Sequence, residues 1–159
     1  MNTKPLRTLI LATALSTALP VHAQQPTNAQ ESRTAEVIDR FNQAFVQHDG
    51  SLLEGLVAED CVMESVEPAP DGTRYVGRAA CLSFWQNLAN SRDSAFAPED
   101  VVVSGDHAII RWRYRFGPEL SQSVRGVTVM RLRDGLIVEA LGYAKSGDPS
   151  VAAAVRNTH

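Results

Sequence analysis

The chain has 159 residues, of which 44% are apolar, and its formal net charge is -3. This length and composition predict one soluble globular domain and exclude both a wholly disordered chain and a multidomain enzyme. The acidic balance argues against a nucleic-acid partner, because binding phosphates requires a basic surface.

Residues 1–23 have the pattern of a secretory signal peptide. Lys4 and Arg7 give a basic start, a mostly apolar run follows over 9–19, and the segment ends in a small-residue cleavage site, Val21-His22-Ala23. The apolar run is too short to span a membrane, and no cysteine follows the cleavage site to carry a lipid. We therefore expect a periplasmic or secreted protein without a membrane anchor, in which the polar residues 24–33 form a flexible leader.

The domain is expected to begin with two helices. Apolar residues at helical spacing predict a long helix that has Thr34 as its N-cap and stops at Asp49-Gly50. Ser51 and Glu54 have the spacing of a capping box, which predicts a short second helix that ends near Glu59-Asp60.

A strand, a loop and a third helix are expected next. Cys61 to Val66 has the composition of a strand, and Glu67 to Gly77 contains two prolines and two glycines, which is typical of an irregular loop. In the third helix, the apolar residues share one helical face. These residues are Cys81, Leu82, Trp85, Leu88 and Ala89.

After Asn90 the apolar pattern alternates, which predicts strands over 96–103, 108–116, 123–133 and 136–144. Asp134-Gly135 is the clearest hairpin signal in the chain. Helices followed by strands predict an α+β fold, with the helices packed on one face of an antiparallel sheet. Residues 146–159 are expected to form a flexible or short-helical tail.

Several short motifs follow one another along the domain: Phe41 with the Asp49-Gly50 stop, Ala58-Glu59-Asp60, Gly77-Arg78 with Phe84-Trp85, and Arg125-Gly126-Val127 with Asp134-Gly135-Leu136-Ile137-Val138-Glu139. With the order of elements, they make the chain resemble the SnoaL-like and nuclear-transport-factor-2-like superfamily, which has the ketosteroid-isomerase-like fold. The resemblance covers roughly residues 34–145. It implies a cone-shaped domain in which a curved sheet wraps a long N-terminal helix, joined by two shorter helices, and leaves an apolar pocket at the open end. It implies no single function, because the superfamily includes isomerases, cyclases, hydrolases and binding proteins.

Strand parity predicts which side chains face the core. Over residues 110–116, apolar side chains alternate with Arg111, Arg113 and Arg115, so only the apolar set can face inward. On the first strand, the resemblance places the face that carries Ser65 inward. The side chains expected to line a ligand pocket are Phe45, Met63, Ser65, Trp85, Trp112, Tyr114, Thr128 and Met130.

The catalytic groups of the superfamily's best-understood enzymes are missing. Ketosteroid isomerases use an oxyanion hole made of a Tyr and a protonated Asp, together with a general-base Asp. The positions that resemble the Tyr, the base and the protonated Asp hold Phe41, Ser65 and Thr128. A phenyl ring donates no proton, and neither hydroxyl acts as an acid or base near neutral pH without a neighbouring base. The positions that resemble the Asp, Arg and Asp of limonene-epoxide hydrolases hold Trp112, Tyr114 and Gly142.

The sequence therefore predicts an exported domain that binds a small apolar or aromatic molecule, without a cofactor. Three alternatives stay open. The aromatic residues can simply fill a core. The chain can be an isomerase, cyclase or hydrolase that uses other residues, such as Glu67, Asp71 or Arg74 near the pocket mouth. It can also be an interaction module, because the resemblance implies a homodimer through the outer face of the sheet.

The outward arginines have two interpretations. Together with Arg131 and Arg133, the three arginines of residues 111–115 could form a basic stripe that binds an anionic partner or another subunit. The favoured interpretation is a solvent-exposed face on which these arginines pair with Glu and Asp from adjacent strands.

Cysteine and histidine give little further information. Cys61 and Cys81 form either a disulfide or two separate core thiols, and the sequence favours neither. His48, His107 and His159 lack metal-ligand spacing, so no metal site is expected.

Overall fold

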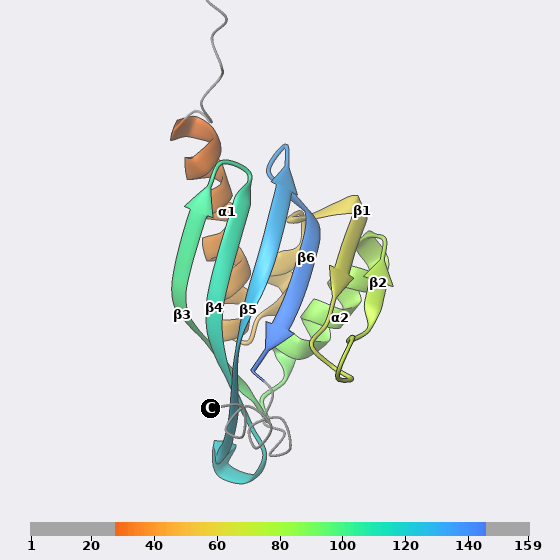
Figure 1. Ribbon diagram of the computed structural model, residues 1–159, viewed down its shortest axis with the longest axis vertical. Coiled ribbons are helices and arrows are strands. Elements are labelled where there is room, and N and C mark those ends of the chain that lie inside the picture. The colour runs from red at the N-terminus through yellow and green to blue at the C-terminus, as the bar shows by residue number, and fades with distance from the viewer. Residues whose placement is uncertain (1–27, 146–159) are drawn as a thin grey trace, which may run out of the picture.

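The computed structural model describes residues 28–145, and Figure 1 shows their arrangement. The predicted signal peptide, the start of the leader and the predicted tail over 146–159 lie outside the described residues. Within residues 28–145, none of the helices has the length and apolar character needed to cross a membrane.

Two α-helices pack on one face of a six-stranded curved sheet, which confirms the predicted α+β fold (Figure 1). The strand order is β2-β1-β6-β5-β4-β3. Helix α1 packs mainly on β3, and α2 packs on β1. The elements are α1 (Asn28–Val46), the 3-10 turn η1 (Gly50–Leu53), β1 (Val57–Glu64), β2 (Arg74–Val76), α2 (Arg78–Asn90), β3 (Ala95–Ser104), β4 (His107–Phe116), the 3-10 turn η2 (Pro118–Leu120), β5 (Gln122–Arg133) and β6 (Leu136–Ala144).

The sheet is mixed, so the expectation of a purely antiparallel sheet is wrong at one pair of strands. Strand β1 runs parallel to β6, with Met63 opposite Ala140. Tight turns force neighbouring strands to be antiparallel, but no tight turn joins β1 to β6, so the sequence pattern leaves their relative direction open. The predicted loop 67–77 also contains β2, which pairs antiparallel with β1.

Helix α1 begins at Asn28, six residues before the predicted N-cap Thr34. Part of the predicted flexible leader is therefore helical. The hydroxyl of Thr34 donates to the carbonyl oxygen of Gly105 at 2.8 Å, and the amide of Gly105 donates to Glu31 Oε1 at 3.1 Å. Polar contacts with the β3–β4 turn hold the first turns of the helix, so this segment has no apolar periodicity for sequence analysis to detect.

The predicted second helix is replaced by η1 and the first residues of β1. Asp49 caps η1 by accepting from the amide of Ser51, so Asp49, and not Ser51, is the capping residue. Gly55 adopts a φ of 75°, which is outside the helical region, and the chain then enters β1 at Val57. The predicted inward residues Leu53 and Val57 are nevertheless buried.

The inward and outward residues of β4 alternate as predicted. Ile110 and Trp112 are buried against the helices, whereas Arg111 and Arg115 are exposed on the other face. The sheet therefore has an apolar inner face that packs on α1 and α2 and a charged outer face.

Candidate functional site

A cavity of about 290 Å³ lies between the two α-helices and the inner face of the sheet. Its size is close to the lower limit for small-molecule pockets. The lining is mostly apolar. It consists of Phe41, Phe45, Met63, Glu64, Ser65, Val66, Glu67, Phe84, Trp85, Leu88, Phe96, Ile110, Trp112, Tyr114, Val124, Thr128, Ala140 and Gly142.

A continuous chain of five aromatic rings forms one wall of this cavity. Trp85 of α2 meets Phe41 edge-on with 5.2 Å between ring centroids, and Phe41 lies 4.9 Å from Phe45. Phe96 of β3 continues the chain, 5.1 Å from Phe45 and 6.0 Å from Trp112. Each ring holds its neighbour in place, so the wall is rigid and presents flat apolar surfaces to the cavity.

Seven of the eight predicted pocket residues border this cavity; the exception is Met130. Met130 faces inward as predicted, but it is fully buried between Ala108 and Ala140 of the neighbouring strands. The alternation of residues along a strand determines the face of the sheet on which a residue lies. It does not determine whether that position along the strand borders the cavity. The β6 neighbour of Met130, Ala140, still borders the cavity, whereas the Met130 side chain does not.

Several further residues that were not predicted also line the cavity. Phe96 lies near the start of β3, and Phe84 lies next to the predicted Trp85 on α2. Phe84 contacts Tyr75 of β2, a strand that the sequence analysis did not predict. The apolar character of these residues was visible, but their positions depend on how α2 lies across the sheet.

The hydrogen bonds of two predicted polar residues are already used within the protein. The hydroxyl of Ser65 donates to the carbonyl oxygen of Glu67 at 2.7 Å and accepts from the amide of Thr73 at 3.0 Å, so it holds the loop after β1. The indole nitrogen of Trp112 donates to Thr128 Oγ1 at 2.9 Å.

Donors remain available at the cavity. Among residues 28–145, the hydroxyl hydrogens of Thr128 and Tyr114 and the indole N–H of Trp85 have no acceptor. The fully buried side-chain polar atoms that lack a partner in this part of the chain are Asn42 Oδ1 and His48 Nδ1. The Tyr114 hydroxyl and the Trp85 indole nitrogen are not among these fully buried atoms.

The carboxylates at this cavity are those of Glu64 and Glu67, within the described part of the chain, and the phenol of Tyr114 also borders it. Glu64 pairs with Arg74 at 2.7 Å on the partly exposed rim, and Glu67 follows in the loop. Of the three loop residues proposed as possible catalytic groups, Glu67 borders the cavity, whereas Asp71 and Arg74 do not. No group of three or more His, Cys, Asp or Glu side chains over 28–145 is arranged to hold a metal ion.

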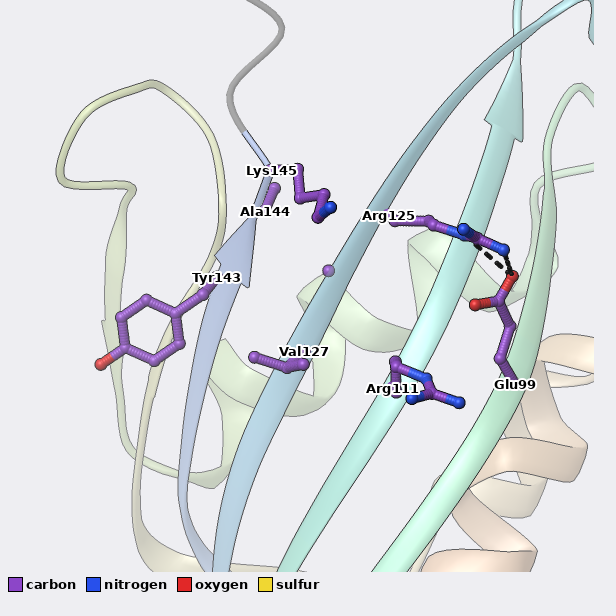
Figure 2. Close-up of a pocket in the computed structure, with 8 residues that line it drawn as sticks. Glu99, Arg111, Arg125, Val127, Tyr143, Ala144 and Lys145 are labelled. Atoms are coloured by element: carbon purple, nitrogen blue, oxygen red, sulfur yellow. Dashed lines mark hydrogen bonds and ion pairs between the residues drawn. The ribbon is translucent and has the colours of Figure 1, made fainter. Parts of the chain in front are cut away.

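A second hollow, of about 540 Å³, lies on the outer face of the sheet. Figure 2 shows Arg125 of β5 reaching across β4 towards Glu99 of β3, with Tyr143 and Lys145 on the β6 side. Glu99 Oε1 accepts from Arg113 at 3.1 Å and from Arg125 at 3.0 Å. Burial alone would raise the pKa of Glu99, but these two hydrogen bonds hold it below its ordinary value.

Other outward arginines also have acidic partners, two of them on the adjacent strand as the favoured interpretation predicted and one on β1, beyond β6. The pairs are Arg111–Asp100, Arg131–Glu139 and Arg133–Asp60. The outer face is therefore a largely paired surface rather than an uncompensated basic patch.

Comparison with known proteins identifies this architecture. The protein-family model of the SnoaL-like domain matches residues 38–140, which is more than half of the chain. The chain belongs to the SnoaL-like domain family. This match confirms the predicted superfamily, and the aromatic cavity lies within the matched region of this SnoaL-like domain.

Solved structures give the same fold. An NTF2-like protein of unknown function from Mesorhizobium loti is 47% identical, with a TM-score of 0.69, and the alignment covers 74% of this chain and 94% of that one. A candidate ketosteroid isomerase from Kribbella flavida is 18% identical (TM-score 0.63, covering 75% and 82%). A candidate polyketide cyclase from Sinorhizobium meliloti is 21% identical (TM-score 0.55, covering 67% and 93%). None of the curated proteins compared with this chain matches it.

Proposed function

We propose that this SnoaL-like domain binds a small, flat, mostly apolar molecule in its inner cavity. The observation that carries the proposal is the chain of five aromatic rings along the cavity wall, from Trp85 to Trp112. Flat ring faces bind planar apolar molecules with favourable dispersion contacts and little loss of side-chain entropy.

The free polar groups of the cavity favour a ligand with hydrogen-bond acceptors. Thr128 Oγ1 already accepts from Trp112, so its own hydrogen is directed elsewhere. Tyr114 and Trp85 add two further donors without an acceptor in residues 28–145. A ketone, ester or ether oxygen satisfies these donors, whereas a ligand that offers only donors leaves both sides unpaired.

Binding without catalysis is the function that these residues support best. Phe41, Ser65 and Thr128 line the cavity, and the resemblance matches them to the positions of the catalytic groups in ketosteroid isomerases. The hydroxyl of Ser65 is engaged by the loop, and that of Thr128 is paired with an indole. Within residues 28–145, neither hydroxyl is hydrogen-bonded to a basic side chain that would make it a nucleophile.

An enzyme of the isomerase, cyclase or hydrolase kind is the second candidate. One observation favours it: Glu67 borders the cavity, and a carboxylate at the mouth of an apolar pocket has the chemistry of a general base. Two structures of the same fold are candidate isomerase and cyclase proteins. The replacement Glu67→Gln separates the two functions, because it abolishes a base without changing the aromatic wall.

The binding proposal is tested with Prodan, a flat, neutral naphthalene that carries one ketone oxygen and fluoresces more strongly in apolar surroundings. Fluorescence titration of the purified protein is expected to show saturable binding, and Trp112→Ala is expected to weaken it by about tenfold or more, equivalent to about 1.4 kcal/mol. Arg111→Ala is the matched control, because Arg111 precedes Trp112 on β4 but faces outward. Absence of saturable binding, or equal weakening by both variants, would reject the proposal.

A homodimer through the outer face of the sheet is also proposed. The strand register aligns four outward apolar side chains in one row across β3, β4, β5 and β6: Val102, Ile109, Val129 and Leu141. Val102 is 55% exposed and Ile109 is 45% exposed. Contiguous exposed apolar surface is uncommon in monomers and favours association.

The charges beside this apolar row suit a second copy of the chain. The pair Asp100–Arg111 lies on one side of the row, and the pair Arg131–Glu139 lies on the other. Each side thus carries both signs of charge. Two copies related by a two-fold axis can place acidic groups of one against arginines of the other.

We further propose that the protein is exported. This proposal rests on the sequence of residues 1–23 alone. Expression of the full chain in a Gram-negative host, followed by fractionation and intact-mass measurement, is expected to give a periplasmic product that begins at Gln24. A cytoplasmic product that retains Met1 to Ala23 would reject the export proposal and leave the cavity proposal untouched.

A further inference from the structure

Cys61 and Cys81 come together where α2 begins to cover β1. Cys61 lies on the inner face of β1, and Cys81 lies one turn into α2. Both side chains are fully buried, and both are free thiols in this structure.

The backbone between these cysteines is held by short hydrogen bonds. The amide of Gly77 donates to the carbonyl oxygen of Cys61 at 2.7 Å, and the amide of Cys81 donates to the carbonyl oxygen of Gly77 at 3.1 Å. Gly77 therefore fixes the first turn of α2 directly over Cys61. As a result, Cys81 Sγ lies 3.5 Å from the carbonyl oxygen of Cys61 itself.

We propose that Cys61 and Cys81 form an intrachain disulfide when the protein folds under oxidising conditions. With glutathione disulfide as the oxidant, the two thiols together lose two electrons and two protons. The Cys61–Cys81 sulfur–sulfur bond forms while the sulfur–sulfur bond of glutathione breaks, which yields two molecules of reduced glutathione.

The bond is expected to form during folding rather than in the folded protein. Burial raises the pKa of both Cys61 and Cys81, and the neighbouring Cys81 thiol raises the pKa of Cys61 further. The thiolate is the reactive species in exchange, and neither sulfur is accessible to a bulky disulfide once α2 has docked. Exchange therefore takes place while α2 is still detached from β1.

The disulfide would connect two walls of the aromatic cavity. Met63 follows Cys61 by two residues on the same face of β1, and Trp85 follows Cys81 by one helical turn on α2. Both residues border the cavity. A covalent connection between these elements keeps Trp85 in place even when the surrounding contacts loosen.

The test is refolding of the full chain in a buffer of reduced and oxidised glutathione, followed by denaturation, alkylation with iodoacetamide and intact-mass measurement. The expected product carries no alkyl group and is lighter than the reduced chain by two hydrogen atoms. Two alkyl groups, a glutathione adduct or a covalent dimer as the main product would each overturn the proposal.

A stability measurement distinguishes a formed bond from a passive pair of thiols. The thermal unfolding midpoint of the refolded protein is expected to fall by several degrees when dithiothreitol is added. The double variant Cys61→Ala/Cys81→Ala is the control, and its midpoint is expected to be unaffected by the reductant. An equal response of both proteins to dithiothreitol would contradict the proposed disulfide.

Discussion

The indole nitrogen of Trp112 donates to the hydroxyl oxygen of Thr128, 2.9 Å away on the neighbouring strand. This hydrogen bond lies inside the cavity, where water competes poorly for either partner. It fixes the plane of the Trp112 ring and directs the hydroxyl hydrogen of Thr128 away from the indole. One contact thus determines both the shape of the aromatic wall and the polarity that the cavity offers to a ligand.

Replacing Thr128 with Val tests this contact, because valine keeps the shape of the side chain and removes the hydroxyl. The buried indole N–H is left without its acceptor, so the free energy of unfolding is expected to fall by about 1–3 kcal/mol in urea titrations. Prodan binding is expected to weaken more than binding of the same fluorophore without its carbonyl group. Thr73→Val, at an exposed loop position, is the control. An unchanged unfolding curve for Thr128→Val would contradict the assigned role.

A substitution at Met130 tests whether an inward residue fills the core or contacts a ligand. It is fully buried but does not border the cavity. Met130→Ala is expected to lower the free energy of unfolding by about 2–5 kcal/mol, because it leaves an empty space in packed surroundings. The affinity for Prodan, measured where the variant is fully folded, is expected to stay within about twofold of the wild type. A large loss of affinity would show that the cavity extends to Met130.

Gly126 is required because the Trp112 ring occupies the space beside it. A Cβ atom at this position would overlap the far end of the indole and the carbonyl oxygen of Tyr143. Gly126→Ala is therefore expected to displace the ring, lower the free energy of unfolding by about 1–3 kcal/mol and change the tryptophan emission spectrum. If the emission spectrum and stability both matched the wild type, the ring would not be held as the structure shows.

The hydrogen bonds of Glu99 are expected to make the stability of the fold depend on pH in a defined direction. Its pKa lies below the ordinary value of 4.5 because of hydrogen bonds from Arg125 and Arg113. A carboxyl with a depressed pKa stabilises the folded state fully above its unfolded pKa, and this contribution is lost as the pH falls through the folded value. The stability advantage of the wild type over Glu99→Gln in urea is thus expected to be present at neutral pH and to diminish as the pH falls below 4.5. Glu36→Gln, at an exposed position on α1, is the control for the loss of one negative charge.

Ile109 tests the proposed dimer. It lies within the apolar row on the outer face, and Ile109→Glu introduces a charge that two copies would bury without a partner. Light scattering coupled to size exclusion is expected to give the dimer mass for the wild type and the monomer mass for this variant. Arg115→Glu, on the same strand and face but away from the row, is expected to remain dimeric. A monomeric wild type across the micromolar range would reject the dimer.

The sequence predicted the inner and outer faces of the sheet because its chemistry alternates sharply. Arginine at every second position over residues 111–115 of β4 left one possible inward side, and burial of Ile110 and Trp112 followed from that pattern alone. The hairpin at Asp134-Gly135 was equally local, because two residues at a positive φ determine it.

The features that the sequence did not predict depend on distant parts of the chain. The parallel pairing of β1 with β6 joins segments that no tight turn connects. The first turns of α1 are held by Gly105 through Glu31 and Thr34, and polar contacts of this kind leave no periodic signal. Likewise, which inward residues border the cavity depends on the helices packed against the sheet, and the pattern of a single strand does not specify this.

The central position of β6 restricts when the domain can fold. This strand is the last one in the described residues and lies between β5 and β1, so the strands at the start of the domain have no continuous sheet to join until residues 136–144 are available. Closing such a long connection costs chain entropy before any contact compensates for it, which slows folding. The helices and the first strands therefore cannot complete the sheet before residues 136–144 are available, and a truncation just before β6 is expected to leave a chain without a stable tertiary structure.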